Sequence, residues 1–172
     1  MGIDPGLRLT GYACIDIRDS ALTPGAAFHL PSPGEGVQII EAGVFRLGSN
    51  RTISERLLEL DTDLCEVIQR LGPSLVAVEK LYSHYKHPTT AAIMGHARGV
   101  VLLGIRRAGI QLLELGATEV KKSLTGHGHA SKSQMQHAVA SQLGLVVMPD
   151  PPDVADAIAI ALCAGRRRTA LL

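Results

Sequence analysis

The sequence predicts an α/β fold in which a five-stranded mixed sheet carries helices on both faces. Two patterns support this prediction. Apolar residues alternate with polar ones in parts of the first fifty residues, as in antiparallel strands, and later recur every three or four residues, as in amphipathic helices. Short apolar runs then alternate with helical segments. The chain has 172 residues, of which 46% are hydrophobic and 19% charged, and we expect one domain over residues 1–172.

Five segments are predicted to be strands. The first ends at an Asp-Pro-Gly turn, the second alternates and the third has β-branched content, and we expect the three to form an antiparallel meander. The fourth is short and wholly apolar, as expected of a strand buried in the middle of a sheet. In chain order the five cover residues 1–4, 10–17, 37–47, 75–78 and 110–115. Three of the nine prolines lie between the second and third strands, so residues 19–36 are predicted to form an extended surface loop.

Five further segments are predicted to be helices. The first has apolar residues at three- and four-residue spacing as far as Leu71 and is ended by Gly72 and Pro73. The last is almost uniformly apolar after its first turn, which predicts a helix buried nearly all round. The five cover residues 49–71, 88–108, 117–124, 131–143 and 154–164.

Composition argues against several classes of protein. The net charge of +1 does not by itself indicate nucleic-acid binding, so a DNA-binding surface needs local clusters of basic residues. The scattered Cys14, Cys65 and Cys163 form neither a metal motif nor a disulfide framework. No apolar run approaches the roughly 20 residues that cross a bilayer, and no secretory signal is recognised. We therefore expect a cytoplasmic protein with no membrane partner.

Four carboxylates stand at the ends of predicted elements. Asp4 follows the first strand at an Asp-Pro-Gly turn, and Glu79 follows the buried fourth strand. Asp153 and Asp156 begin the last helix, and their spacing of three residues puts them on one helix face. Each also has an ordinary structural explanation: a turn residue, a solvated strand end, a helix N-cap, and an acid favoured by the helix dipole. For each residue alone, these explanations are about as good as a functional one.

The functional explanation is a metal site. Ligands of open α/β sheets bind beyond the carboxyl ends of the strands, which is where Glu79 stands. Clustered carboxylates repel one another, and hard cations with oxygen ligands relieve that repulsion. Two Mg²⁺ ions about 3.5–4 Å apart would suit phosphodiester hydrolysis. His127 and His129 have three interpretations: metal ligands, contacts to DNA phosphate, or a solvated loop, of which the last is favoured.

Five stretches of the chain, taken together, resemble one known family. They are GIDPGLRLTGYA at 2–13, VAVEK at 76–80, GHARGVV at 95–101, VKKSLTGHGHASKSQMQ at 120–136 and DVADAIAIA at 153–161. Their order and their spread over nearly the whole chain are similar to those of the RuvC family. Its members are Holliday-junction resolvases with the RNase H-like fold, so the resemblance implies that fold here.

The resemblance also implies a role for each matching acid and lysine. Two Mg²⁺ ions per active site, replaceable by Mn²⁺, would be held by four catalytic ligands: Asp4, Glu79, Asp153 and Asp156. Lys132 would join these as a catalytic residue near the scissile phosphate, and Lys121 would bind the substrate beside it.

Two further residues are candidate substrate contacts through the resemblance. Tyr82 falls where the family has an aromatic that stacks on an unpaired base, a contact worth about 1–3 kcal/mol, and local packing is the alternative. Arg98 belongs to a helix that contributes to the dimer interface in the family, and intrachain packing is its alternative.

The function implied is a metal-dependent endodeoxyribonuclease that resolves four-way DNA junctions in recombination and repair. Paired symmetric nicks would leave 5′-phosphate and 3′-hydroxyl ends, and a homodimer would match the two-fold symmetry of the junction. A branch-migration helicase complex would be a further partner. The candidate phosphate contacts are Arg106, Arg107, Lys121, Lys122, Lys132 and the arginines at 166–168. For the arginine run a solvated C-terminal tail is favoured.

Other functions and one departure from the family pattern remain. The rivals are an RNase H-like nuclease of the YqgF type, which would act on RNA or other DNA, and a junction-binding protein without catalysis. The GIDPG stretch also resembles the phosphate turn of actin-like ATPases and sugar kinases, but 172 residues cannot supply their two facing domains. Family members have an apolar run before the first Gly-Ile-Asp, whereas only Met1 precedes it here, so we expect a short first strand or a start assigned late.

Overall fold

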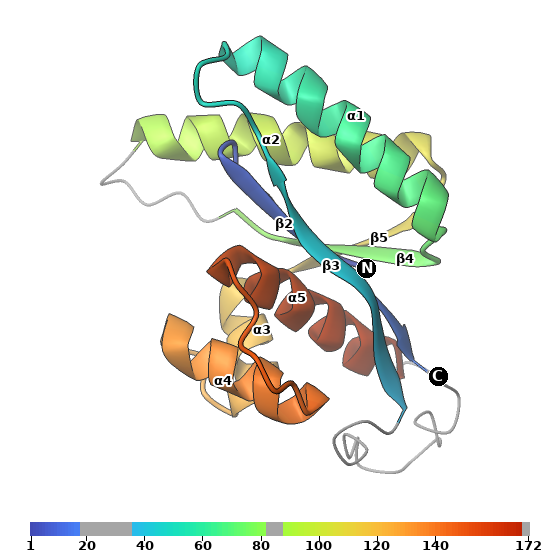
Figure 1. The fold of residues 1–172 in the computed structure, drawn as a ribbon, viewed down its shortest axis with the longest axis vertical. Coiled ribbons are helices and arrows are strands. Elements are labelled where there is room, and N and C mark those ends of the chain that lie inside the picture. Colours follow the sequence, from blue (N-terminus) through green and yellow to red (C-terminus); the bar gives the residue numbers. More distant parts are fainter. Residues whose placement is uncertain (18–35, 82–87, 170–172) are drawn as a thin grey trace.

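The computed structural model describes residues 1–17, 36–81 and 88–169, which form a five-stranded sheet between two groups of helices (Figure 1). The strands are β1 (Gly2–Asp4), β2 (Leu9–Ile17), β3 (Val37–Arg46), β4 (Leu75–Glu79) and β5 (Gln111–Leu115). Their order in the sheet is β3-β2-β1-β4-β5. The pairs β1–β2 and β2–β3 are antiparallel, whereas β1–β4 and β4–β5 are parallel. The predicted mixed sheet and its antiparallel meander are confirmed.

The helices lie on both faces of the sheet, as predicted. Helices α1 (Ile53–Leu71) and α2 (Pro88–Arg107) cover one face. The other face carries α3 (Ala117–Thr125), α4 (Lys132–Leu143) and α5 (Pro152–Thr169), with α5 directly on the sheet (Figure 1). Within the described residues, no helix is both long and apolar enough to cross a membrane.

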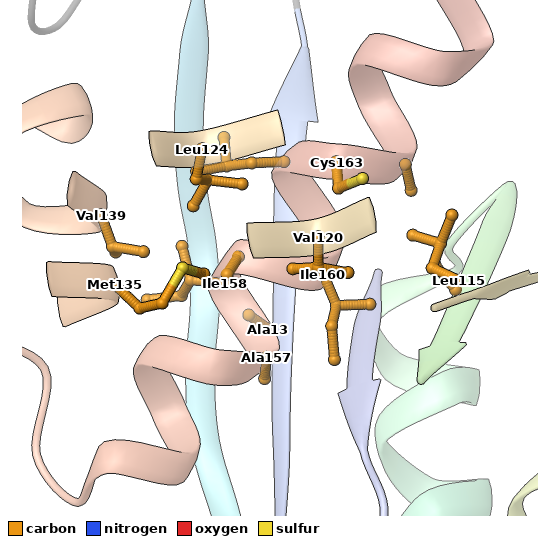
Figure 2. Close-up of a cluster of buried hydrophobic side chains, with 14 of the residues drawn as sticks. Ala13, Leu115, Val120, Leu124, Met135, Val139, Ala157, Ile158, Ile160 and Cys163 are labelled. Atoms are coloured by element: carbon orange, nitrogen blue, oxygen red, sulfur yellow. The ribbon is translucent and has the colours of Figure 1, made fainter. Parts of the chain in front are cut away.

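Strand alternation divides the core into two clusters, one on each face of the sheet. Ile3, Val76 and Val78 pack with α1 and α2, whereas Ala13 and Ala77 pack on the side of α5. Figure 2 shows the second cluster, in which side chains of α3, α4 and α5 meet those of β2 and β5. Between residues 154 and 165 every residue except Asp156 is buried, so the prediction of a nearly enclosed last helix is confirmed.

Helix α1 begins four residues later than predicted. Thr52 is its N-cap, and the Thr52 hydroxyl oxygen accepts a hydrogen bond from the Glu55 amide at 3.3 Å. The Glu55 carboxylate in turn accepts one from the Thr52 amide at 2.7 Å. This reciprocal capping box satisfies two amides of the first turn, so the helix starts at Ile53.

Helix α5 is longer than predicted at both ends. It begins at Pro152, a residue suited to the first helical position because it has no amide hydrogen to satisfy. Asp153 therefore lies within the first turn, and the alternative that it is the N-cap is wrong. At the other end the helix continues through Arg166 and Arg167 to Thr169, so the favoured interpretation of the arginine run as a solvated tail is also wrong.

The arginines of α5 hold the helix against its neighbours. Arg166 donates hydrogen bonds to the Ser123 carbonyl oxygen on α3 and, at 2.9 Å, to Gln142 Oε1 on α4. Arg167 pairs with Glu119 at 3.0 Å. These bonds occupy two side chains that were candidate phosphate contacts, and they fix the group of helices that carries much of the site.

Two predictions lie outside the described residues: Tyr82, and the loop at 19–36 apart from Gly36. The expected short first strand is confirmed, since β1 has three residues. It is nevertheless held between β2 and β4, and its Ile3 is fully buried.

Candidate active site

Two of the four predicted carboxylates stand side by side at one edge of the sheet. In the parallel pairing of β1 and β4, Gly2 lies beside Ala77 and Ile3 beside Val78, so Asp4 and Glu79 come next at the carboxyl ends of both strands. Because side chains alternate between faces, both acids lie on the face that carries α5. Register and alternation together place this half of the site.

A buried threonine fixes the turn after Asp4. The Thr10 hydroxyl donates a hydrogen bond to the Gly6 carbonyl oxygen at 2.6 Å, and its oxygen accepts one from the Gly6 amide at 3.1 Å. Thr10 is fully buried and is the buried polar residue of the described core. The sequence analysis missed it. The signal was a hydroxyl residue four positions after the glycine of an Asp-Pro-Gly turn, a pattern in which side chain and backbone bond locally.

Close contact between α5 and the sheet brings the other two carboxylates to the same place. A Cβ atom on Gly11 of β2 would overlap the Asp153 carbonyl oxygen, and one on Gly2 would overlap the backbone of α5. Gly11 is also the residue that pairs with Asp4 across β1 and β2. The backbone of Asp153 therefore rests against the strand residue beside Asp4. The sequence analysis did not identify this role for the two glycines.

Two adjoining cavities meet at the carboxylates. Asp4, Glu79 and Lys121 line both of them. The smaller, of about 270 Å³, is also lined by Lys132 and Asp156. The larger, of about 650 Å³, extends past Glu79 along α2 and the loop between α3 and α4 to Leu81, Met94, Arg98 and His129. The elements β1, β4, α3, α4 and α5 thus contribute charged side chains to one continuous depression.

The electrostatics of the cavity oppose ionisation of its acids. Burial, followed by the charges of Glu79, Asp156 and Asp153, raises the pKa of Asp4 from 3.8 to about 7. The pKa of Glu79 is raised by burial and by Asp156, and that of Asp156 by burial, against the lowering effect of Lys132. The cluster therefore holds more negative charge than its protein surroundings neutralise.

Two lysines balance part of this charge. The Lys132 ammonium lies 3.8 Å from Asp156 Oδ2, and its side chain is 78% exposed. Lys121 on α3 lines both cavities and lowers the pKa of Glu79. The position of Lys132 follows from the capping box of Ser131 and Gln134, which starts α4 at Lys132. Both predicted lysines thus lie at the carboxylate cluster.

Arg98 joins α2 to the strands that carry the site. Its Nε donates a hydrogen bond to the Glu79 carbonyl oxygen at 3.1 Å, and its guanidinium pairs with the Glu114 carboxylate on β5. The side chain is 18% exposed and lines the larger cavity. Intrachain packing, one of the two interpretations of Arg98, is confirmed.

Other predicted phosphate contacts lie away from the cavities. Arg106 and Arg107 end α2, with Arg106 eight residues beyond Arg98, or about 12 Å along the helix axis. Arg107 also pairs with Asp61 at 3.4 Å. Lys122 is exposed on α3.

The donor set fits a hard divalent cation. Carboxylate oxygens are the ligands preferred by Mg²⁺ and Mn²⁺, and the raised pKa values mark a deficit of positive charge. Among the described residues, no three His, Cys, Asp or Glu side chains are gathered as a finished coordination shell.

Comparisons with known proteins identify the family of this chain. The family model described as crossover junction endodeoxyribonuclease RuvC matches residues 1–164. A protein of that name from Rhodopirellula baltica is 44% identical over 163 residues, covering 95% of this chain and 83% of its own length. A second, from Caldicellulosiruptor saccharolyticus, is 39% identical, with coverages of 95% and 89%.

A solved structure is similar over almost the whole chain. Thermus thermophilus RuvC in complex with a Holliday junction substrate superposes with a TM-score of 0.79 at 31% identity, covering 98% of this chain and 94% of that one. The likeness confirms the RNase H-like fold expected from the sequence motifs.

Proposed function

Because the chain belongs to the RuvC family, we propose that it is a metal-dependent endodeoxyribonuclease that resolves four-way DNA junctions by paired nicks. The observation that carries the proposal is the meeting of Asp4, Glu79 and Asp156 in one cavity that two lysines also line, with Asp153 close enough to raise the pKa of Asp4 and of Asp156. A turn residue, a strand end and a helix start have no structural reason to share one depression. Cleavage of a phosphodiester is a functional reason for these residues to lie together.

The four carboxylates are the proposed ligands of two Mg²⁺ ions, with Mn²⁺ as a substitute. When bound, the ions supply an activated water and neutralise charge on the scissile phosphate. The chain's own part is positioning. A bound cation would relieve the repulsion that raises the pKa of these acids, and Thr10 and Gly11 keep two of their backbones fixed.

Basic residues complete the proposed site. Lys132 is exposed beside Asp156 and is free to turn from that acid to a phosphate oxygen, and Lys121 also lines the smaller cavity. We assign Lys132 to the catalytic group and Lys121 to substrate binding. Arg98 contributes through the Glu79 backbone and lines the cavity that the substrate enters. Stacking of Tyr82 on an unpaired base stays a proposal.

The proposed products are a 5′-phosphate and a 3′-hydroxyl at each nick, and the proposed place of action is the cytoplasm. The proposed assembly is a homodimer that offers one site to each of two opposed strands. A branch-migration helicase complex is the further partner that the family resemblance implies. The single RNase H-like domain over residues 1–172 is part of the same proposal.

The first test compares nicking of a four-way junction, a linear duplex and an RNA–DNA hybrid in Mg²⁺ and in Mn²⁺. We expect symmetric nicks in the junction alone, and loss of cleavage by at least about a hundredfold in Asp4→Asn, because a neutral amide is a poor ligand for a hard cation. Junction binding should survive this change.

Asp16→Asn is the matched control, since Asp16 is exposed on β2 and lines none of the three cavities described here. It should cleave as the wild type does. Equal cleavage of all three substrates would indicate another RNase H-like nuclease and contradict the proposal of a resolvase. Junction binding without cleavage in the wild type would indicate a junction-binding protein that lacks catalysis.

A further inference from the structure

A third cavity lies beside the active site, between the α3–α4 loop and α4. Its volume is about 480 Å³. It is lined by Thr125, His127, His129, Ala130, Ser133, Gln134, His137 and Ala138, and we call it the histidine cavity. None of these residues is acidic, in contrast to the carboxylate cluster next to it. His129 lines this cavity and the larger active-site cavity, so the two are neighbours.

The loop that carries two of the histidines is held by its own hydrogen bonds. The Thr125 hydroxyl oxygen lies 2.8 and 3.0 Å from the carbonyl oxygens of Lys121 and His127, either of which can accept its one hydrogen, and it accepts a hydrogen bond from the His127 amide at 3.1 Å. A Cβ atom on Gly128 would lie 2.6 Å from a Thr118 methyl, so the loop packs closely on α3. His127 and His129, on either side of Gly128, are both exposed. Two imidazoles are therefore presented from a fixed backbone.

Helix α4 separates the histidine cavity from the carboxylates. Lys132 and Met135 line the smaller active-site cavity, whereas Ser133, Gln134 and His137 line the histidine cavity. The His137 Nδ1 lies 2.7 Å from the Ser133 carbonyl oxygen and donates to it, which leaves Nε2 for a ligand. One helical turn thus serves two neighbouring cavities, one through a lysine and the other through a histidine and hydroxyls.

The chemistry of the histidine cavity suits a phosphate. Imidazoles and hydroxyls are donors for anionic oxygens, and an imidazolium formed against a phosphate donates a charge-assisted hydrogen bond. A transition metal fits less well. The described residues contain no gathered set of three His, Cys, Asp or Glu side chains at this cavity.

We infer that the histidine cavity binds a backbone phosphate of the junction strand, next to the scissile phosphate. The inference rests on the proposed function, because it needs a DNA strand in the adjacent carboxylate cavity. A strand that crosses the start of α4 passes from Lys132 to His129 and His137. The cavity would fix the register of the strand over the catalytic acids.

The experiment is a thermodynamic cycle between protein and DNA. Junctions with a single neutral methylphosphonate at successive positions around the cut site are titrated with wild type and with the double variant His127→Ala, His137→Ala. Binding is measured with Ca²⁺ in place of Mg²⁺, so that cleavage does not interfere. The cycle isolates a direct contact, because two changes that remove the same contact are not additive.

We expect the double variant to bind the unmodified junction about tenfold more weakly, as for the loss of a charge-assisted hydrogen bond. At one or two phosphates beside the cut, the methylphosphonate should weaken wild-type binding and have no further effect on the double variant. His129→Ala should show the same coupling, and His129→Asn, which keeps a donor, should restore part of the affinity.

Additive effects at every phosphate would overturn the inference, as would unchanged affinity in the double variant. Arg51→Ala removes an exposed positive charge next to α1, on the other face of the sheet, and should show no coupling. Circular dichroism and melting confirm that the variants are folded. If the wild type neither binds nor nicks the junction, the proposed function itself fails, which is a different result from a bound junction without coupling.

Discussion

At the scale of single residues, burial and neighbouring charges oppose the ionisation of Asp4 more strongly than that of the other acids in the site. Its carboxyl group is enclosed at the end of β1, and three other acids act on it while one lysine opposes them. In the absence of a cation, the folded chain therefore favours the protonated form of Asp4. In the unfolded chain Asp4 has its ordinary pKa, so the raised pKa in the folded chain affects stability as well as catalysis.

We predict that wild-type stability relative to Asp4→Asn falls between about pH 4 and pH 7 when divalent cations are removed. The folded pKa of Asp4 is about 7 and its ordinary value is 3.8, so the folded state holds a proton that the unfolded state releases over this range. Stability from this group is complete below pH 3.8 and is lost as the pH rises towards 7. The full difference is up to about 4 kcal/mol. Chemical unfolding of both proteins at a series of pH values measures it.

Addition of Mg²⁺ should recover this stability above pH 7 in the wild type more than in Asp4→Asn. A cation that binds the folded, ionised cluster and not the unfolded chain stabilises by mass action. A stability difference that does not change with pH would show that Asp4 titrates normally, and would remove the electrostatic argument for a cation site.

At the scale of elements, periodicity and turn chemistry predicted nearly every strand and helix. The spacing of Leu57, Leu60 and Leu64 was sufficient for α1, because one face of that helix is buried against the sheet. The start of α1 was missed, since the pattern does not show that Thr52 and Glu55 cap each other. Boundaries depend on such local bonds rather than on periodicity.

The candidate site was predicted less completely than the fold. The four acids were found because they follow strands or begin a helix, and the family motifs joined them. Gly11 and Thr10 were missed because their roles depend on which backbone lies against them in space. The intrachain bond of Arg98 to the Glu79 carbonyl oxygen has no signal in the sequence, since the two residues are nineteen positions apart.

We predict that Gly11→Ala reduces cleavage more than it reduces stability. The new methyl group would overlap the Asp153 carbonyl oxygen and would lie 3.4 Å from the Ala157 Cβ, so α5 must shift away from β2. Overpacking of this kind costs about 1–3 kcal/mol. The shift moves Asp153 and Asp156 from Asp4, so we expect cleavage to fall by about tenfold or more at a temperature where the variant is folded.

Gly43→Ala is the matched control for this change. Gly43 also lies in a strand, but the atoms nearest to a Cβ there belong to the Tyr12 side chain, at 3.0–3.2 Å, and not to α5. It should lower the melting temperature and leave cleavage by the folded protein near the wild-type rate. Full activity in Gly11→Ala would show that the contact of α5 with β2 does not set the site.

At the scale of the whole molecule, one face of α2 has no partner within the described chain. Ala97, Val101 and Ile105 of this helix are buried against the core, whereas the opposite face exposes Ala92, His96, Gly99 and Leu103 at helical spacing. Small residues allow two helices to approach closely, and the Leu103 side chain is 48% exposed. This exposed α2 face is the proposed interface of the homodimer, and a two-fold axis there would relate two active sites.

We predict that Leu103→Glu converts the proposed dimer to a monomer and uncouples the two nicks. Two-fold symmetry would bring the new carboxylates of both protomers together in an apolar interface. Their mutual repulsion and the cost of removing them from water would both oppose dimerisation. Sedimentation velocity should show the mass of one chain. On a plasmid with an extruded cruciform, the wild type should give linear product from paired cuts, and the variant should give nicked circles.

Val146→Glu tests whether any exposed apolar residue would have this effect. Val146 is fully exposed in the loop between α4 and α5, on the other side of the sheet from α2. This variant should remain dimeric and should still make paired cuts. If Leu103→Glu is still a dimer, the interface does not lie on α2. If the wild type is a monomer in solution and still makes paired cuts, symmetric resolution does not require a dimer in solution.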